Sequence, residues 1–222
     1  MTQKMPSAVR DHAMQIAHHE MGHYVVARAL GFATGGVTLT VTMDLRHQAG
    51  ASITLARSMS SIDAIKDYLE ARMMVLFAGA MGQSLASEQS SGKHVDRRKA
   101  AAILKGEQGA EQDYAKIREL GHLLRNITYP DTNAASSDRT AAELKEITDR
   151  LWFRTQTIVE ELADTITGLA GMLVDGMVIV EQWGRAADTY EGVLTREVLE
   201  GLRLVQAIPA TSVLMGTSGV AG

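Results

Sequence analysis

The sequence predicts a single, mainly helical α+β domain with a small β-sheet. Apolar residues recur at helical spacing over most of the 222 residues, whereas the segment 35–56 alternates apolar with polar side chains. Aromatic residues make up only 5% of the chain and 12 residues are Met, a composition suited to helices packed through flexible side chains. We expect residues 1–128 to form the core, 129–205 to add a C-terminal helical part to the same domain, and 206–222 to form a flexible tail.

The first predicted helix covers about residues 7–30. Gly31 follows its last apolar position and is typical of a helix end. The segments "MQIA" and "YVVARAL" flank the polar centre of this helix, and their apolar character indicates a helix that is buried on most sides. The apolar positions at helical spacing are Val9, Ala13, Ile16, Ala17, Met21, Tyr24, Val25 and Ala29.

The next segment changes from helical to strand periodicity. Val37, Leu39 and Val41 alternate with threonines, and Ile53 and Leu55 alternate in the same way after the turn-like "RHQAG". Such alternation is typical of strands with one buried face. We therefore expect a β-hairpin, or two strands of a small sheet.

A long apolar helix is predicted over residues 62–85. Ser60 and Asp63 have the spacing of a capping box at its start. A short helical segment at 100–105 and a further helix within 108–127 follow it.

The C-terminal half is predicted to be mostly helical. Ser137 is a suitable cap for a helix over about 138–173, and a last helix starts at Thr195. The stretch 174–193 between them is ambiguous between helix and irregular structure. The apolar stripe of the long helix consists of Leu144, Ile147, Leu151, Ile158, Leu162, Ile166 and Leu169.

The composition excludes several classes of protein. The net charge is −4 and the sequence pI is about 6.0, so we predict no nucleic-acid partner. The chain has no Cys, so any zinc site must use His and carboxylate ligands. The most apolar run, 73–82, is far shorter than the ~20 residues that cross a bilayer, and the first residues lack the apolar core of a secretion signal. We expect a cytoplasmic protein with no membrane partner.

The first helix carries "HHEMGH" at 18–23, which contains the zinc-binding pattern H-E-x-x-H. Residues four apart share one face of a helix, so His19 and His23 can bind one zinc ion through their imidazoles. Glu20 lies about 100° around the helix, where it can act on a water molecule as general base without being a ligand. His18 points away from that face, and we expect it to have a supporting role.

The same short motif occurs by chance in amphipathic helices whose histidines are solvated or hydrogen-bonded. Burying histidines in so apolar a helix is costly unless something compensates them, which favours the zinc site. A catalytic zinc needs one further protein ligand, which must come from downstream. Spacing alone does not choose among Glu70, Glu88, His94, Asp96, Glu107, Glu111 and Asp113.

Three blocks follow one another in a characteristic order: "AHHEMGHYVVARAL", the Ala/Gly-rich "ARMMVLFAGAMGQSLA" and "GAEQDYAKIREL". Together they resemble the peptidase domain of FtsH-type zinc proteases over roughly residues 10–205, most strongly at 17–30 and 109–120. The resemblance implies a zincin-like HExxH helix, a helical C-terminal region and a metallopeptidase core within residues 1–128. The roles that it implies are zinc ligands for His19, His23 and Asp113 and general base for Glu20.

The resemblance also implies a function, that of a zinc-dependent metalloendopeptidase acting on polypeptide substrates. FtsH-type proteases carry membrane spans and an ATPase module, whereas we expect a free-standing domain here, because no Gly-rich phosphate loop ending in Lys-Ser or Lys-Thr occurs. Cleavage is then expected to be ATP-independent and limited to unfolded or exposed segments, unless a separate ATPase partner delivers substrate. A homo-oligomer is a further expectation from the family.

Two other functions are compatible with the sequence. One is a dedicated protease of a single regulator. The other is a non-catalytic, zinc-binding interaction or regulatory module, although such a module has no reason to keep Glu20, which is not a ligand.

Several features outside the motif carry further expectations. The family has two glutamates at the end of the second helix where this chain has Gln83 and Ser84, which removes any carboxylate support for the metal ligands at that place. From the family likeness, the strand at 37–43 is expected to offer a free edge to an extended substrate, with an internally paired strand as the alternative. His94 lies in a longer segment, 86–108, that we interpret as a solvated insertion with a lid as the alternative.

Overall fold

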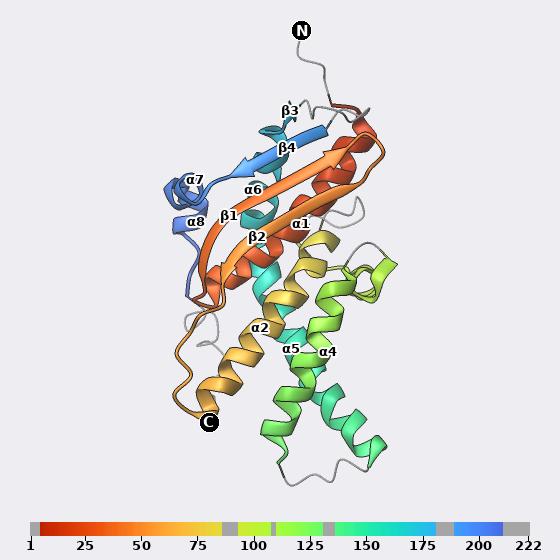
Figure 1. The fold of residues 1–222 in the computed structure, drawn as a ribbon, viewed down its shortest axis with the longest axis vertical. Helices are drawn as coiled ribbons and strands as arrows, with labels where there is room; N and C mark the ends of the chain where they lie inside the picture. Colours follow the sequence, from red (N-terminus) through yellow and green to blue (C-terminus); the bar gives the residue numbers. More distant parts are fainter. Residues whose placement is uncertain (1–4, 86–92, 108–109, 131–135, 181–188, 211–222) are drawn as a thin grey trace.

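The computed structural model describes residues 5–85, 93–107, 110–130, 136–180 and 189–210. It confirms the mainly helical α+β fold with a small sheet (Figure 1). Helix α1 lies between the sheet and α2, and α4 and α5 pack against α2. The elements in chain order are α1 (Ser7–Ala29), β1 (Ala33–Thr42), β2 (His47–Thr54), α2 (Ile62–Ser84), α3 (Arg97–Ala102), the π-helical turn η1 (Ile103–Glu107), α4 (Glu111–Thr128), α5 (Ser137–Glu161), α6 (Ala163–Asp175), β3 (Val178–Val180), β4 (Thr189–Leu194), α7 (Arg196–Gly201) and α8 (Arg203–Gln206).

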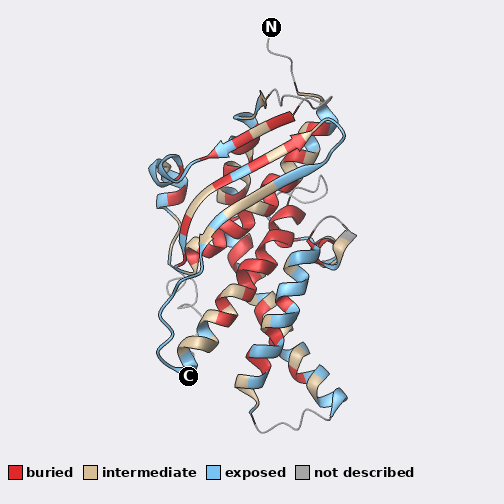
Figure 2. Cartoon of the chain, viewed as in Figure 1, coloured by how far each residue is buried: buried red, intermediate tan, exposed pale blue. Residues whose placement is uncertain are grey.

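Helix α1 is the centre of the core because almost every side of it is apolar. Buried residues run along most of α1 and along the second half of α2 (Figure 2). The helix ends as predicted, with Gly31 at a φ of 79° that residues with a side chain rarely adopt. The histidines of "HHEMGH" are therefore part of the core, where each needs a partner.

The sheet is antiparallel, with strand order β2-β1-β4-β3. Val37, Leu39 and Val41 of β1 are fully buried on the face that packs against α1, whereas Thr38 between them is exposed on the other face. The predicted hairpin is thus confirmed as β1 and β2. Strand β2 forms one edge of the sheet, and none of its residues is fully buried.

The other two strands were not predicted. They come from the stretch 174–193, which the sequence leaves ambiguous between helix and irregular structure, and of which 181–188 lie outside the described residues. Strand β3 has only three residues, and β4 lies between β1 and β3 with α6 against it. Burial alternates from Tyr190 to Leu194, but Gly192 is buried and Val193 exposed, so the residue types do not show the alternation in the sequence.

Helices α1 and α2 approach each other closely because glycines meet at their crossing. A Cβ atom on Gly22 would lie 2.2 Å from the carbonyl oxygen of Ala78. A Cβ atom on Gly82 would lie 2.5 Å from the carbonyl oxygen of His18. Side chains at these positions would push the two backbones apart. The crossing places the histidines of α1 directly on the surface of α2.

Three helix boundaries differ from the prediction. The residue at the cap position of α5 is Ser136 and not Ser137, and the side chain of Ser136 forms no capping hydrogen bond. The cap of α2 is Ser61 and not Ser60, and its Oγ accepts a hydrogen bond of 3.1 Å from the N–H of Ala64. The helix predicted over 138–173 is two helices, α5 and α6, which meet at Leu162. No Gly or Pro marks this break, and the apolar stripe continues across it, so the sequence carries no signal for it.

Within the described ranges, no helix combines the length and the apolar character that crossing a membrane requires. The predicted tail at 206–222 lies mostly outside the described residues, which end at Ala210.

Candidate metal centre

Two helices bring three side-chain acceptors together beneath the edge of the sheet. The Nε2 atoms of His19 and His23 on α1 lie 3.0 Å apart. Oδ2 of Asp113, in the first turn of α4, lies 3.2 Å from Nε2 of His19 and 3.0 Å from Nε2 of His23. Two ligands of a tetrahedral zinc ion with bonds of ~2.0–2.1 Å are about 3.3 Å apart. The three atoms therefore have the spacing of one face of a zinc tetrahedron, and the group could hold a metal ion.

The second nitrogen of each imidazole faces an oxygen that can only accept. Nδ1 of His19 is 3.0 Å from Oε1 of Gln83, and Nδ1 of His23 is 2.8 Å from the carbonyl oxygen of Val75. In a metal-bound state the ring proton of both histidines is therefore assigned to Nδ1. The Nε2 lone pairs then converge with a carboxylate oxygen, an arrangement that is repulsive unless a cation lies between them. The donor set fits zinc, which favours imidazole and carboxylate ligands.

The space for the two rings comes from Gly79 on α2. A Cβ atom at this position would lie 2.5 Å from Nε2 of His23 and 2.7 Å from Nε2 of His19. Gln83 lies one helical turn further along the same face of α2 and supplies the acceptor for His19. As the sequence indicates, no carboxylate stands at this place, and the neutral amide of Gln83 makes the supporting contact.

The charges of the three side chains are coupled. Burial raises the pKa of the Asp113 carboxyl, but hydrogen bonds from His19 and His23 outweigh it and hold that pKa far below its ordinary range. Burial lowers the pKa of His23, and the hydrogen bond and negative charge of Asp113 outweigh it, so the net shift is upward. In the metal-free protein, a proton shared by His23 and Asp113 takes the place of the cation.

This coupling predicts opposite effects of pH on stability and on metal binding. The raised pKa of His23 contributes stability that is fully present below its ordinary value of 6.5 and is lost as the pH rises through the folded value. The lowered pKa of Asp113 contributes stability above its ordinary 3.8, which is lost as the pH falls towards the folded value. The contribution of His23 to the free energy of unfolding of the chelated protein should therefore rise on acidification from about pH 8 to about pH 6. Burial lowers the pKa of His12, His18 and His47, which contribute with the opposite sign, so the contribution of His23 is measured as the difference between the wild type and Asp113→Asn. The same change should weaken zinc binding, because zinc must displace the proton on His23. Urea unfolding and zinc titration at each pH test both trends, and the variant Asp113→Asn should lose the first.

Gln83 offers a test of the supporting contact. Replacement by Leu leaves the Nδ1–H of His19 buried without its acceptor, and we expect zinc affinity to fall about 10- to 100-fold. The variant Gln83→Glu keeps an acceptor at the same distance and should bind zinc at least as tightly as the wild type. Competition with a chromogenic chelator measures both, and equal affinity of the Leu variant would contradict the role of Gln83.

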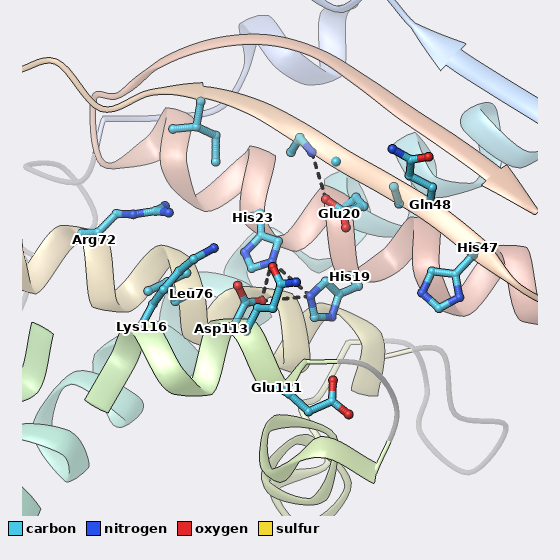
Figure 3. Close-up of a pocket in the computed structure, with 15 residues that line it drawn as sticks. His19, Glu20, His23, His47, Gln48, Arg72, Leu76, Glu111, Asp113 and Lys116 are labelled. Atoms are coloured by element: carbon cyan, nitrogen blue, oxygen red, sulfur yellow. Dashed lines mark hydrogen bonds and ion pairs between the residues drawn. The ribbon is translucent and has the colours of Figure 1, made fainter. Parts of the chain in front are cut away.

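Glu20 lies next to this group without being part of it. Its Oε2 accepts a hydrogen bond of 2.9 Å from the backbone N–H of Ala51 on β2 (Figure 3). Successive N–H groups of a strand point to opposite sides, so Ala51 faces away from β1 and towards the cleft. The contact fixes one carboxylate oxygen of Glu20 and leaves Oε1 facing the cleft.

The acceptor group and Glu20 line an open cleft of about 430 Å³ between α1, β2, α2 and α4. The strand at the cleft is β2, whose outer edge pairs with no other described strand. Strand β1 is paired on both sides, with β2 and with β4. The expectation that the strand at 37–43 offers a free edge is therefore wrong, and β2 has the edge in question.

Most of the other candidate ligands have different roles. Glu70 forms ion pairs of 2.7 Å with Arg150 and Arg154 on α5, away from the cleft. Asp96 caps α3 by accepting hydrogen bonds from the N–H groups of Arg98 and Lys99. Neither carboxylate is free to join the histidines.

The remaining candidates are not part of the group either. His94 is mostly exposed, as predicted, and lies near Glu160 on α5. Glu111 lines the cleft but is absent from the cluster, which among the described residues consists of His19, His23 and Asp113. Glu88 and the side chain of Glu107 lie outside the described residues.

His18 and His47 complete the account of the histidines around the cleft. Nδ1 of His18 is 2.8 Å from the carbonyl oxygen of Met14, and burial lowers the pKa of His18, which fits the supporting role predicted for it. His47 lines the cleft, and its Nδ1 is 3.1 Å from Nε2 of His12. Sequence reasoning missed this pair, although His12 precedes His19 by two helical turns and so shares its face of α1.

Neither a family model nor a curated protein matches this chain. The assignment of the site therefore depends on its geometry and on the motifs already described.

Proposed function

We propose that the protein is a zinc-dependent metallopeptidase that cuts extended polypeptide segments. The observation that carries the proposal is the convergence of the acceptor atoms of His19, His23 and Asp113 in an open cleft, with Glu20 beside them. Three protein ligands leave one position of a tetrahedral zinc ion for water or substrate, which is the composition of catalytic zinc sites. The resemblance of the motifs to the FtsH-type peptidase domain supports the same assignment.

Each side chain has a defined part in this reaction. Zinc held by the three ligands supplies a Lewis acid for the peptide carbonyl and a water molecule of lowered pKa. Glu20 takes a proton from water in the cleft and transfers it to the leaving nitrogen. Its hydrogen bond to Ala51 holds the carboxylate in place for both transfers. Gln83 and the carbonyl of Val75 keep the imidazoles oriented.

Strand β2 supplies the means to hold a substrate. The N–H of Ala51 points to Glu20 and not to β1, so the backbone groups of Ala51 and of every second residue on either side of it point from the free edge into the cleft. An extended peptide can add to such an edge as a further strand, held by main-chain hydrogen bonds. A folded segment cannot, so we expect cleavage of unfolded or exposed segments, without ATP. The residues with outward-facing backbone groups are His47, Ala49, Ala51 and Ile53, of which Ala51 already donates its N–H to Glu20.

The test is cleavage of casein and of a mixed peptide library by the zinc-loaded protein, with and without a chelator. We expect cleavage that the chelator abolishes and added zinc restores. The variant Glu20→Gln should keep its zinc and lose about 10²- to 10⁴-fold in rate, because it cannot accept the proton. Unchanged cleavage by this variant removes the proposed mechanism. A wild-type protein that binds zinc but cuts no peptide would favour the non-catalytic module.

A further inference from the structure

Two positive side chains enter one end of the cleft. Arg72 comes from α2 and Lys116 from α4, one helical turn after Asp113. In Figure 3 both side chains extend towards the same space beside His23 and Asp113, on the side opposite His47. Helix α4, which carries Asp113, and helix α2, which supports the two imidazoles, therefore place a pair of cations beside the candidate metal ligands.

Within the described parts of the chain, neither cation forms an ion pair or a hydrogen bond with another side chain. Other charged residues on the same two helices do have partners. Glu70 on α2 is paired with two arginines, and Arg125 on α4 donates a hydrogen bond of 2.9 Å to Glu143. The groups whose charge acts on Arg72 are Tyr68 and, after it, Asp113, whose carboxylate is committed to the two histidines.

Of the two unpaired cations, Arg72 is the one whose burial is energetically unfavourable. Its side chain is half-buried, and burial lowers the pKa of its guanidinium. A guanidinium has five N–H donors in a planar fork, and a half-buried one without an acceptor is unfavourable. A carboxylate fits this fork with two parallel hydrogen bonds, and Lys116 can add a third from an exposed position.

We propose that Arg72 and Lys116 form a carboxylate-binding subsite that selects the peptides cut at this centre. The inference rests on the proposed function, because it names the substrate class of that same cleft. The carboxylate is either the C-terminus of the peptide or an Asp or Glu side chain close to the cut bond. Glu20 and Glu111 lie on the side of Asp113 away from the two cations (Figure 3), so an acidic group is repelled there and attracted at the cationic end.

The experiment uses one peptide that the zinc-loaded protein cuts, prepared in three forms. The first has a free C-terminus and an internal Glu, the second a C-terminal amide, and the third Gln in place of the Glu. We expect either the second or the third form to be cut about 10- to 100-fold less efficiently, as judged by kcat/KM, and the affected form identifies the source of the carboxylate. The variant Arg72→Gln should lower kcat/KM for the preferred form by a similar factor and leave the non-preferred form nearly unaffected.

Matched variants separate charge recognition from a structural effect. Arg118→Gln removes a cation from the same helix as Lys116 but outside the cleft, and it should preserve the preference. Arg72→Glu should reverse the preference towards peptides with Lys at the selected position. Zinc content should stay at the wild-type level in all of these variants. Loss of zinc in Arg72→Gln would make Arg72 a support of the metal centre and overturn the inference.

The outcomes distinguish this inference from the proposed function. Equal cleavage of the three peptide forms would support the proposed peptidase activity and contradict the carboxylate-binding subsite. If no peptide is cut, fluorescence anisotropy measures binding of the labelled acidic and amidated peptides to the zinc-loaded protein. Binding that needs the carboxylate, weakens with salt and is lost in Arg72→Gln then supports the subsite without the peptidase. Binding without these properties, or no binding, overturns the subsite.

Discussion

Replacement of Asp113 by alanine is expected to remove the metal from the protein. The change deletes one of three ligands and leaves two imidazoles that by themselves hold zinc only weakly. Loss of a supporting contact behind a ligand costs about 10- to 100-fold in affinity, so loss of the ligand itself should cost more than that. Zinc content measured by mass spectrometry of the purified protein, together with chelator competition, reports the effect.

Glu111→Ala is the matched control for this prediction. Glu111 lies two residues before Asp113 on the same helix and lines the same cleft, yet it is not part of the acceptor group. Its removal changes the net charge of the cleft by the same amount as Asp113→Ala. Full zinc retention in Asp113→Ala, or equal loss in both variants, would show that the third ligand has been misassigned.

The second large effect is expected at Gly79. Its replacement by alanine puts a methyl group 2.5 Å from the ring of His23, a distance that no packed structure tolerates. The rings must turn away from each other, and the acceptor geometry is lost. Loss of a supporting contact lowers metal affinity by up to ~100-fold, and we expect Gly79→Ala to lower zinc affinity by at least that factor. Circular dichroism should show unchanged helical content.

Gly22 and Gly171 separate this effect from a general effect of glycine replacement. Alanine at Gly22 meets the backbone oxygen of Ala78, so it should force α1 and α2 apart and cost about 1–3 kcal/mol or more in the free energy of unfolding. Alanine at Gly171 on α6 meets nothing within 4 Å and should stabilise the protein by about 0.4–1 kcal/mol. Normal zinc affinity in Gly79→Ala would contradict the role of this glycine as the space for the rings.

The part of the site that lies on one helix could be predicted from the sequence. Helical geometry alone places His19 and His23 on one face and Glu20 beside them, so the spacing of the letters fixes their relation. Asp113 lies 94 residues beyond His19, and no local rule connects the two. Its choice from seven candidates depended on a family resemblance, and the structure brings it to the two histidines.

Other features had no local signal at all. Val75 supports His23 through its backbone carbonyl, which every residue has, so no side-chain pattern could single it out. The edge position of β2 depends on β4 pairing with the far side of β1, and β4 comes from a stretch whose residue types do not alternate. Arg72 and Lys116 belong to different helices, and only the packing of α2 against α4 brings them into one cleft.

The surface of α2 beneath the imidazoles has a consequence for finding relatives of this protein. Gly79 must stay without a side chain and Gln83 must keep an acceptor, whereas residue 75 contributes only its backbone and can vary. A glycine and an amide or carboxylate four positions later therefore form a second signature, on the helix that follows the hairpin. Searches that pair this G-x-x-x-[QE] spacing with H-E-x-x-H should recover distant sequences that the zinc motif alone cannot separate from chance.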